Sequence, residues 1–180
     1  MRPLRLTAWV IVLGTSVAAM LVYPTLPSDI PTSINVSGAV TRRAPTSLWS
    51  WFLLPLIMVA LQLVFIALRD RLPRHPESFN FPDKEEFLRL PDEFRGPVVV
   101  QMQWLIDAMS VLVQMVLLMV FALVWYAATG RASGGLMLVP LLMSVMTTPF
   151  VFLLLSRVTN AVEAQTKEWR AAGSPPRATR

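Results

Sequence analysis

Four long apolar segments follow one another along the chain, each separated from the next by a polar or proline-rich stretch. They cover residues 6–23, 48–68, 104–128 and 136–155. A helix rises about 1.5 Å per residue, so about 20 apolar residues cross the hydrocarbon of a bilayer. The segments do not alternate between apolar and polar residues, and isolated strands would leave their backbone unsatisfied in lipid. The pattern therefore predicts four membrane-spanning helices.

The connections between these segments complete the predicted architecture, which is an all-α, integral membrane four-helix bundle. The membrane domain covers residues 1–155. Within it, residues 26–47 form an extracytoplasmic loop that we expect to be ordered, and residues 69–103 form a cytoplasmic connector. Residues 156–180 form a cytoplasmic tail, and the composition of its last ten residues, "AAGSPPRATR", is typical of disorder.

The connector is charged and is interrupted by prolines. Its stretch "DKEEFLRL", residues 83–90, predicts one or two turns of helix. Two interpretations stay open: a solvated charged linker, or a segment whose Phe87, Leu88 and Leu90 rest on the membrane surface. Pro97 is expected in the first turn of the third long helix, where its missing N–H costs nothing.

Composition supports a bilayer as the solvent. Of 180 residues, 54% are hydrophobic and only 15% are charged, against about 25% charged in soluble domains. A net charge of +5 would suggest nucleic acid in a soluble protein. Here the basic residues cluster at the ends of apolar segments, so topology explains them and we expect no nucleic-acid partner.

The distribution of basic residues also predicts an orientation. Of the 16 Lys and Arg residues, only Arg42, Arg43 and Arg131 fall on one side of the predicted membrane. The positive-inside rule therefore places both termini in the cytoplasm. The alternative for the first segment is a signal peptide cleaved near residues 16–18, which would leave three spans.

The outer loop carries an unusually specified sequence. Proline restricts its own backbone and that of the preceding residue, so "LPSDIP" predicts a stiff, extended run with a turn at Ser28 and Asp29. Residues 34–36 are expected to form a short strand, and Asp29 is the expected exposed contact. Apolar side chains of the loop should pack on the helix ends, while Asn35 and Gly38 shape its turns. The candidate loop residues are Leu26, Pro27, Asp29, Ile30, Pro31, Asn35 and Gly38.

A polar stripe follows one face of the third apolar segment. Gln103, Asp107, Ser110 and Gln114 are spaced so that they share one side of a helix. Such a stripe should face other helices or a wet cavity, because lipid would leave it unsatisfied. Two interpretations stay open: interhelical hydrogen bonding with an interfacial acid, or a site for a proton or ligand centred on Asp107.

No constellation of catalytic or metal-binding residues is present in the sequence. The chain has no cysteine and one histidine, His75, and it lacks metal-ligand spacings, phosphate-binding glycine loops and nucleophile elbows. We therefore expect no catalytic residues, no bound metal and no cofactor. The sequence leaves homo-oligomerisation open.

The loop sequence "YPTLPSDIPTSINVSG", followed by "TSLWSWFLLPLI", resembles a bacterial membrane domain family of unknown function. That domain also forms the N-terminal part of Sdp-type immunity proteins, which protect bacteria from a secreted peptide toxin. This chain has Ser33 and Ile34 where the family usually has His and an aromatic residue, and it lacks the further helices of the immunity proteins. The resemblance implies a multi-pass protein of the bacterial cytoplasmic (inner) membrane.

Three classes of function follow from these observations. The leading hypothesis is a non-enzymatic membrane protein whose outer loop binds a peptide or another membrane protein, in an immunity-like or signalling-like role. The second is a small membrane transporter or a transporter subunit, suggested by the polar stripe. The third, a membrane-bound enzyme, has no supporting constellation in the sequence.

Overall fold

The computed structural model describes residues 2–35, 39–131 and 134–173. The chain is mostly helical. Its long helices are α1 (Arg2–Val22), α2 (Leu48–Arg71), α4 (Asp92–Ala128) and α5 (Gly134–Ala171). The shorter elements are η1 (Tyr23–Thr25), β1 (Asp29–Ile34), β2 (Val40–Pro45), η2 (Pro76–Ser78) and α3 (Lys84–Arg89).

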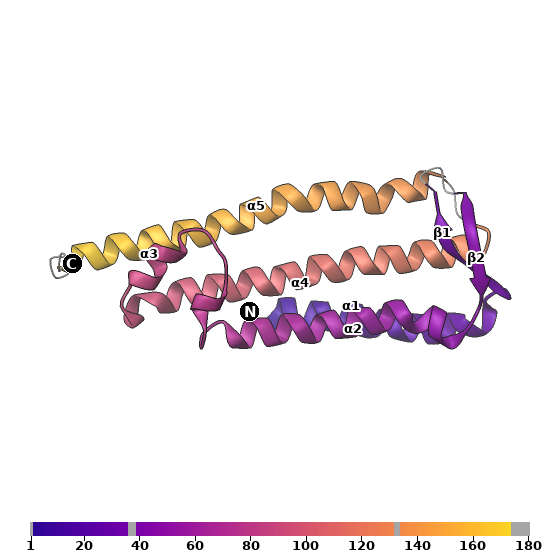
Figure 1. Cartoon of the computed structure of the whole chain (residues 1–180), viewed down its shortest axis with the longest axis horizontal. Coiled ribbons are helices and arrows are strands. Elements are labelled where there is room, and N and C mark those ends of the chain that lie inside the picture. The colour runs from indigo at the N-terminus through magenta and orange to yellow at the C-terminus, as the bar shows by residue number, and fades with distance from the viewer. Residues whose placement is uncertain (1, 36–38, 132–133, 174–180) are drawn as a thin grey trace.

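The long helices lie side by side along the long axis of the molecule (Figure 1). The β1–β2 hairpin lies across one end of this array, and the connector with α3 lies toward the other end. The start of α1 and the end of α5 lie on the side away from the hairpin, so the molecule has a hairpin end and a connector end.

Among the described residues, three helical stretches are long and apolar enough to cross a membrane: Pro3–Thr25, Leu48–Arg71 and Asp92–Ala128. They contain the first three predicted segments. Many of their large apolar side chains are exposed, such as Leu13, Leu21 and Leu63. Extensive exposed apolar surface is expected on helices surrounded by lipid rather than water, and it agrees with a membrane protein.

The hairpin corrects the all-α prediction. Strand β1 pairs with β2 in antiparallel register, with Asp29 opposite Pro45 and Ile34 opposite Val40. The strand predicted at residues 34–36 is therefore misplaced: Ile34 ends β1, and residues 36–38 lie outside the described residues. Pro31 has no N–H to donate across the ladder, and the register shifts directly after it.

Helices α4 and α5 are both longer than predicted. Helix α4 begins at Asp92, so the last part of the predicted connector 69–103 is helical and Pro97 lies inside the helix rather than in its first turn. Asp92 and Glu93 occupy that first turn, where negative charge favours the helix dipole. Helix α5 continues to Ala171, so much of the predicted tail 156–180 is helical.

The connector is a folded cap rather than a solvated linker. Its α3 confirms the short helix predicted within residues 83–90. Phe87 and Leu90 are fully buried instead of resting on a membrane surface. They belong to a cluster that we call the connector core, formed by Leu72, Phe87, Leu90, Val98, Met102, Val158 and Val162. Packing into this core explains why α4 and α5 remain helical beyond their apolar segments.

Phe87 should be a main support of the connector core. It is completely buried, its ring packs edge-on against Phe81 with centroids 5.3 Å apart, and the Arg95 guanidinium lies 5.9 Å from its centroid. Replacing Phe87 by alanine should lower the free energy of unfolding in detergent micelles by about 3–5 kcal/mol. The control is Phe152→Ala, because Phe152 is 68% exposed. Equal losses for the two variants would contradict a packed connector core.

Candidate functional site

Polar side chains meet between α2 and α4, within the apolar part of the bundle. Ser110 Oγ donates to Gln62 Oε1 at 2.7 Å. Gln114 Nε2 donates to the Met58 carbonyl oxygen at 2.9 Å and lies 3.4 Å from Gln62 Oε1. All three polar side chains are at most 2% exposed. The interaction therefore joins the two helices where neither water nor lipid headgroups can satisfy these groups.

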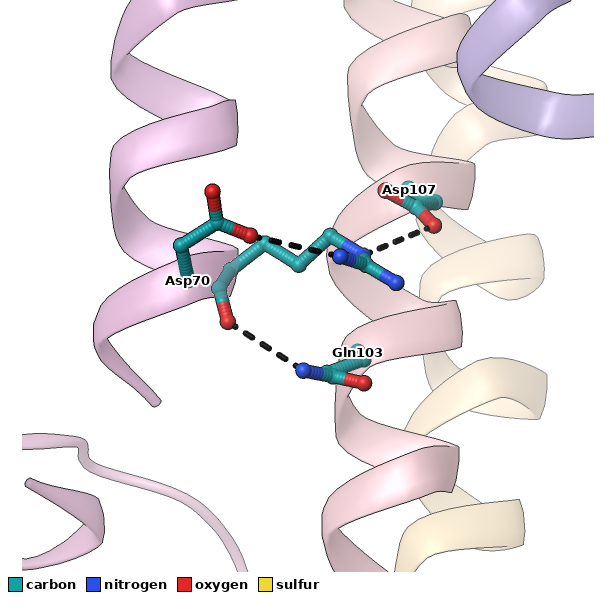
Figure 2. Close-up of polar contacts among 4 residues, drawn as sticks. Asp70, Gln103 and Asp107 are labelled. Carbon is teal, nitrogen blue, oxygen red and sulfur yellow. Dashed lines mark hydrogen bonds and ion pairs between the residues drawn. The ribbon is translucent and has the colours of Figure 1, made fainter. Parts of the chain in front are cut away.

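An ion pair continues this contact toward the connector end. The Arg69 side chain bonds to both Asp70 and Asp107, which are labelled in Figure 2. Arg69 Nε lies 3.2 Å from Asp107 Oδ2, and Arg69 Nη1 lies 3.3 Å from Asp70 Oδ1. Gln103 Nε2 donates to the Arg69 carbonyl oxygen at 3.4 Å. Asp107 is only 4% exposed, so Arg69 supplies the positive charge that makes its burial tolerable.

We call this set the polar seam: Gln62, Arg69, Gln103, Asp107, Ser110 and Gln114. It contains all four residues of the predicted stripe, and each of them contacts α2. The partners on α2 were not predicted. Gln62 is the only strongly polar residue before Arg69 in an otherwise apolar segment, and that isolation is the signal that could have identified it.

Among the buried polar side-chain atoms of the seam that the structure describes, all but one have a hydrogen-bond partner. Gln114 Oε1 is buried and has no hydrogen-bond partner. The amide cannot simply be turned around, because the Met58 carbonyl can only accept a hydrogen bond and needs the Gln114 amide nitrogen facing it. Most of the seam therefore serves as helix-to-helix contact, with a single free acceptor at its hairpin-side limit.

The second candidate site is the hairpin, which is packed onto the helix ends. Ile30 is 3% exposed and lies in a cluster that we call the outer core, formed by Ala19, Ile30, Trp51, Phe121 and Ala128. Trp51 Nε1 donates to the Ala19 carbonyl oxygen at 2.9 Å and its ring packs against Phe121. Strand β1 thus rests on a floor built from α1, α2 and α4.

Hydrogen bonds close the base of the hairpin where it joins α2. Thr46 Oγ1 donates to the Pro27 carbonyl oxygen at 2.6 Å, and the Thr46 N–H donates to the Ser28 carbonyl oxygen at 2.8 Å. Ser47 then caps α2 through a reciprocal pair of bonds with Ser50. The loop therefore enters α2 with a fixed geometry.

The predicted loop residues divide into buried supports and exposed groups. Ile30 and Pro31 are buried, and Leu26 packs against the outer core. Asn35 Oδ1 accepts a hydrogen bond from the Ala39 N–H at 2.8 Å, so its side chain shapes the hairpin turn. Asp29 is exposed at the start of β1. Gly38 lies outside the described residues.

The outward side of the hairpin is polar and positively charged. On β2, Thr41, Arg42 and Arg43 are exposed, and Thr41 Oγ1 donates to Ser33 Oγ at 2.9 Å. Arg43 Nη1 lies 3.4 Å from the Asp29 carbonyl oxygen. Neither arginine forms an ion pair with any residue that the structure describes. Both guanidinium charges are therefore accessible to an acidic partner.

Several described ionisable groups of the connector form ion pairs at the surface of the molecule. Among the described residues, no group of three or more His, Cys, Asp or Glu side chains could hold a metal ion. His75 Nδ1 lies 3.3 Å from Glu77 Oε1 at the surface of the connector. A hydrogen bond to its own backbone lowers the pKa of the Glu77 carboxyl, and the neighbouring His75 adds to this effect. This pair is exposed, and Lys84 Nζ donates to the Glu77 carbonyl oxygen beside it at 2.6 Å.

The ion pair of the seam can be tested by a double-mutant cycle. Arg69→Met should lower the free energy of unfolding in micelles by about 3 kcal/mol, because Asp107 stays buried without its cation. Asp107→Leu should be milder, since Arg69 keeps Asp70 and has a long side chain that reaches water. The stability loss of the double variant should be smaller than the sum of the two single-variant losses, by at least about 1 kcal/mol.

Asp70→Asn serves as the control for this cycle. Asp70 is 55% exposed, so its pairing with Arg69 should contribute less than about 1 kcal/mol. Strictly additive losses for the Arg69 and Asp107 variants would show that the two side chains do not interact in the folded protein.

Comparison with known families gives a match to part of the chain. The model of a family described as a domain of unknown function (DUF1648) matches residues 10–59. No curated protein and no solved structure matches the chain. The matched residues run from within α1 through the hairpin and into α2. The similarity thus covers the part of the chain that builds the hairpin and much of its floor.

Proposed function

We propose that the chain is a non-enzymatic, multi-pass protein of the bacterial inner membrane whose hairpin binds a peptide or another membrane protein outside the cell. Four helices span the membrane, α5 being the fourth, and both termini lie in the cytoplasm. The observation that carries the proposal is an ordered hairpin fixed to the helix ends by Ile30, with two unpaired cations on its outward strand.

Charge and architecture support this topology. Arg42 and Arg43 lie in the hairpin and Arg131 follows α4, while the other described Lys and Arg residues belong to the connector, to the first turns of α1 and α4, or to the parts of α2 and α5 near the connector. The positive-inside rule then places the connector end in the cytoplasm. Helix α5 runs back along α4 and contains the apolar segment 136–155, which is long enough to be a fourth span.

The hairpin has the features of a binding surface rather than a spacer. Its inward side is anchored in the outer core, so its backbone is already ordered and a partner would not have to order it. Strand β1 is the strand that contacts α4, and β2 lies farther from the helices (Figure 1). An outer strand edge offers backbone hydrogen bonds to an extended peptide. Arg42 and Arg43 would favour an acidic partner there.

The family resemblance supports a role of this kind. The loop sequence resembles the domain that forms the N-terminal part of Sdp-type immunity proteins, and the family match to residues 10–59 includes the hairpin. An immunity-like or signalling-like function is the proposal that follows from it. Ser33, which stands where the family usually has His, bonds to Thr41 here, so the proposal involves no proton-linked or metal-linked role at that position.

A membrane transporter, or a subunit of one, is the alternative. The specific observation in its favour is the polar seam, and above all the unpartnered Gln114 Oε1 inside the apolar part of the bundle. A transport path would have to separate α2 from α4 and break the Arg69–Asp107 pair. The hydrogen bonds that close the seam make binding at the hairpin the better-supported proposal.

Site-specific photocrosslinking in bacterial cells can test binding at the hairpin. A benzophenone side chain at Thr41, exposed on β2, should capture a secreted or membrane polypeptide. The double change R42E/R43E in the same protein should reduce the adduct by about tenfold or more, because it reverses the charge that meets the partner.

The control for this experiment places the same photocrosslinker at Glu163, which is exposed on α5 at the connector end. This position should give no adduct with the hairpin's partner. Absence of any adduct at Thr41, or an adduct that is insensitive to the charge reversal, would contradict the proposal.

A further inference from the structure

An apolar groove opens beside the polar seam at the connector end of the bundle. Its volume is about 290 Å³. Three parts of the chain line it: α2 with Phe65, Leu68 and the following Leu72; α4 with Met102, Leu105, Ile106 and Met109; and the connector with Phe79, Asn80 and Phe81. Asn80 is the only polar residue of this lining. We call this feature the connector groove.

The connector groove runs from the aqueous end of α2 into the apolar part of the bundle. At its aqueous end the groove is lined by Leu72 and Phe79, which follow α2. Phe65 of α2 lies about two turns before Leu72, and Met109 of α4 lies about two turns after Met102. Leu68 is 40% exposed, so the groove is open on the outer surface of the helices. In a bilayer, its open side would face the acyl chains of the leaflet on the connector side.

We propose that the connector groove holds one acyl chain of an anionic phospholipid, with its headgroup at Arg71 and Arg74. In the proposed topology this lipid belongs to the inner leaflet. The inference uses the membrane orientation argued above and is independent of what the hairpin binds.

The size and chemistry of the groove favour one acyl chain over other occupants. Water molecules in a buried site need two to four polar partners each, and Asn80 alone cannot supply them. One turn of a helix about 10 Å wide fills about 400 Å³, which is more than the groove offers, so a helix of a second copy does not fit. A flexible apolar chain requires no polar partners, and part of its length can lie in the groove while the rest stays in the bilayer.

The charge beside the groove selects the headgroup. Arg71 is the last residue of α2, next to Leu72 of the lining, and Arg74 follows in the connector. Both are exposed, and neither forms an ion pair with a residue that the structure describes. Basic residues at a membrane surface attract anionic lipids by about 1 kcal/mol each. Phosphatidylglycerol should therefore be retained in preference to phosphatidylcholine.

Native mass spectrometry of the purified full chain can test this site. The protein is mixed with phosphatidylglycerol or phosphatidylcholine of identical acyl chains, and the lipid that survives detergent removal is counted. The wild type should retain one phosphatidylglycerol and about tenfold less phosphatidylcholine. Ile106→Trp, which fills the groove from α4, should reduce the retained phosphatidylglycerol by about tenfold or more.

Two further variants distinguish the groove from general contact with lipid. Leu63→Trp places the same large side chain on an exposed part of α2 outside the lining, and it should retain lipid as the wild type does. The surface change R71Q/R74Q should abolish the preference for phosphatidylglycerol, and it tests the site even if Ile106→Trp does not fold. None of these variants should change photocrosslinking at Thr41. A failure of the lipid proposal can therefore be distinguished from a failure of the proposed binding at the hairpin.

Either of two results would overturn the inference. One is that the wild type retains both lipids equally. The other is that folded Ile106→Trp and Leu63→Trp proteins retain the same amount of phosphatidylglycerol.

Discussion

The contact between α2 and α4 through the polar seam is the interaction on which the rest of the structure depends. Apolar side chains gain little by leaving lipid for a helix interface, so packing and hydrogen bonds between helices must determine how they meet. Ser110 with Gln62, and Asp107 with Arg69, each require one alignment of the two helices. A sliding movement of one turn would leave a buried carboxylate unpaired, at a cost of several kcal/mol.

Fixing α2 against α4 also positions what lies at the two ends of these helices. At the hairpin end, Trp51 of α2 and Phe121 of α4 form the floor that receives Ile30. At the connector end, Leu72 follows α2 and Met102 belongs to α4, and both enter the connector core. The proposed binding hairpin and the proposed lipid groove are therefore built on the same pair of helices, on opposite sides of the seam.

The sequence predicts best those features that depend on local pattern. Segment length identifies the apolar helices, the 3.6-residue period places the α4 stripe on one face, and "DKEEFLRL" indicates α3. The errors concern long-range packing. Nothing local shows that Asp29 pairs with Pro45, or that Phe87 is buried against α4 and α5. That burial keeps α4 helical through Pro97, where propensity alone predicts a helix start.

In the candidate site, too, local sequence pattern predicts some of the residues and long-range packing determines the others. Periodicity alone places the four stripe residues of α4, but their partners on α2 depend on how two distant helices align. Proline and glycine chemistry indicates an ordered outer loop, and the side chain of Asn35 shapes its turn. The second strand, with Arg42 and Arg43, could be recognised only once the hairpin register was known.

Disulfide trapping in native membranes tests the seam most directly. The chain has no cysteine, so pairs can be introduced without background. With a protease site in the exposed connector near Arg74, oxidised Q62C/S110C should keep the two fragments joined after cleavage, because these side chains meet across the seam. The matched pair L63C/S110C should let them separate, since Leu63 is 54% exposed and lies off the seam. Separation of the Q62C/S110C fragments, or equal joining in both variants, would contradict the account.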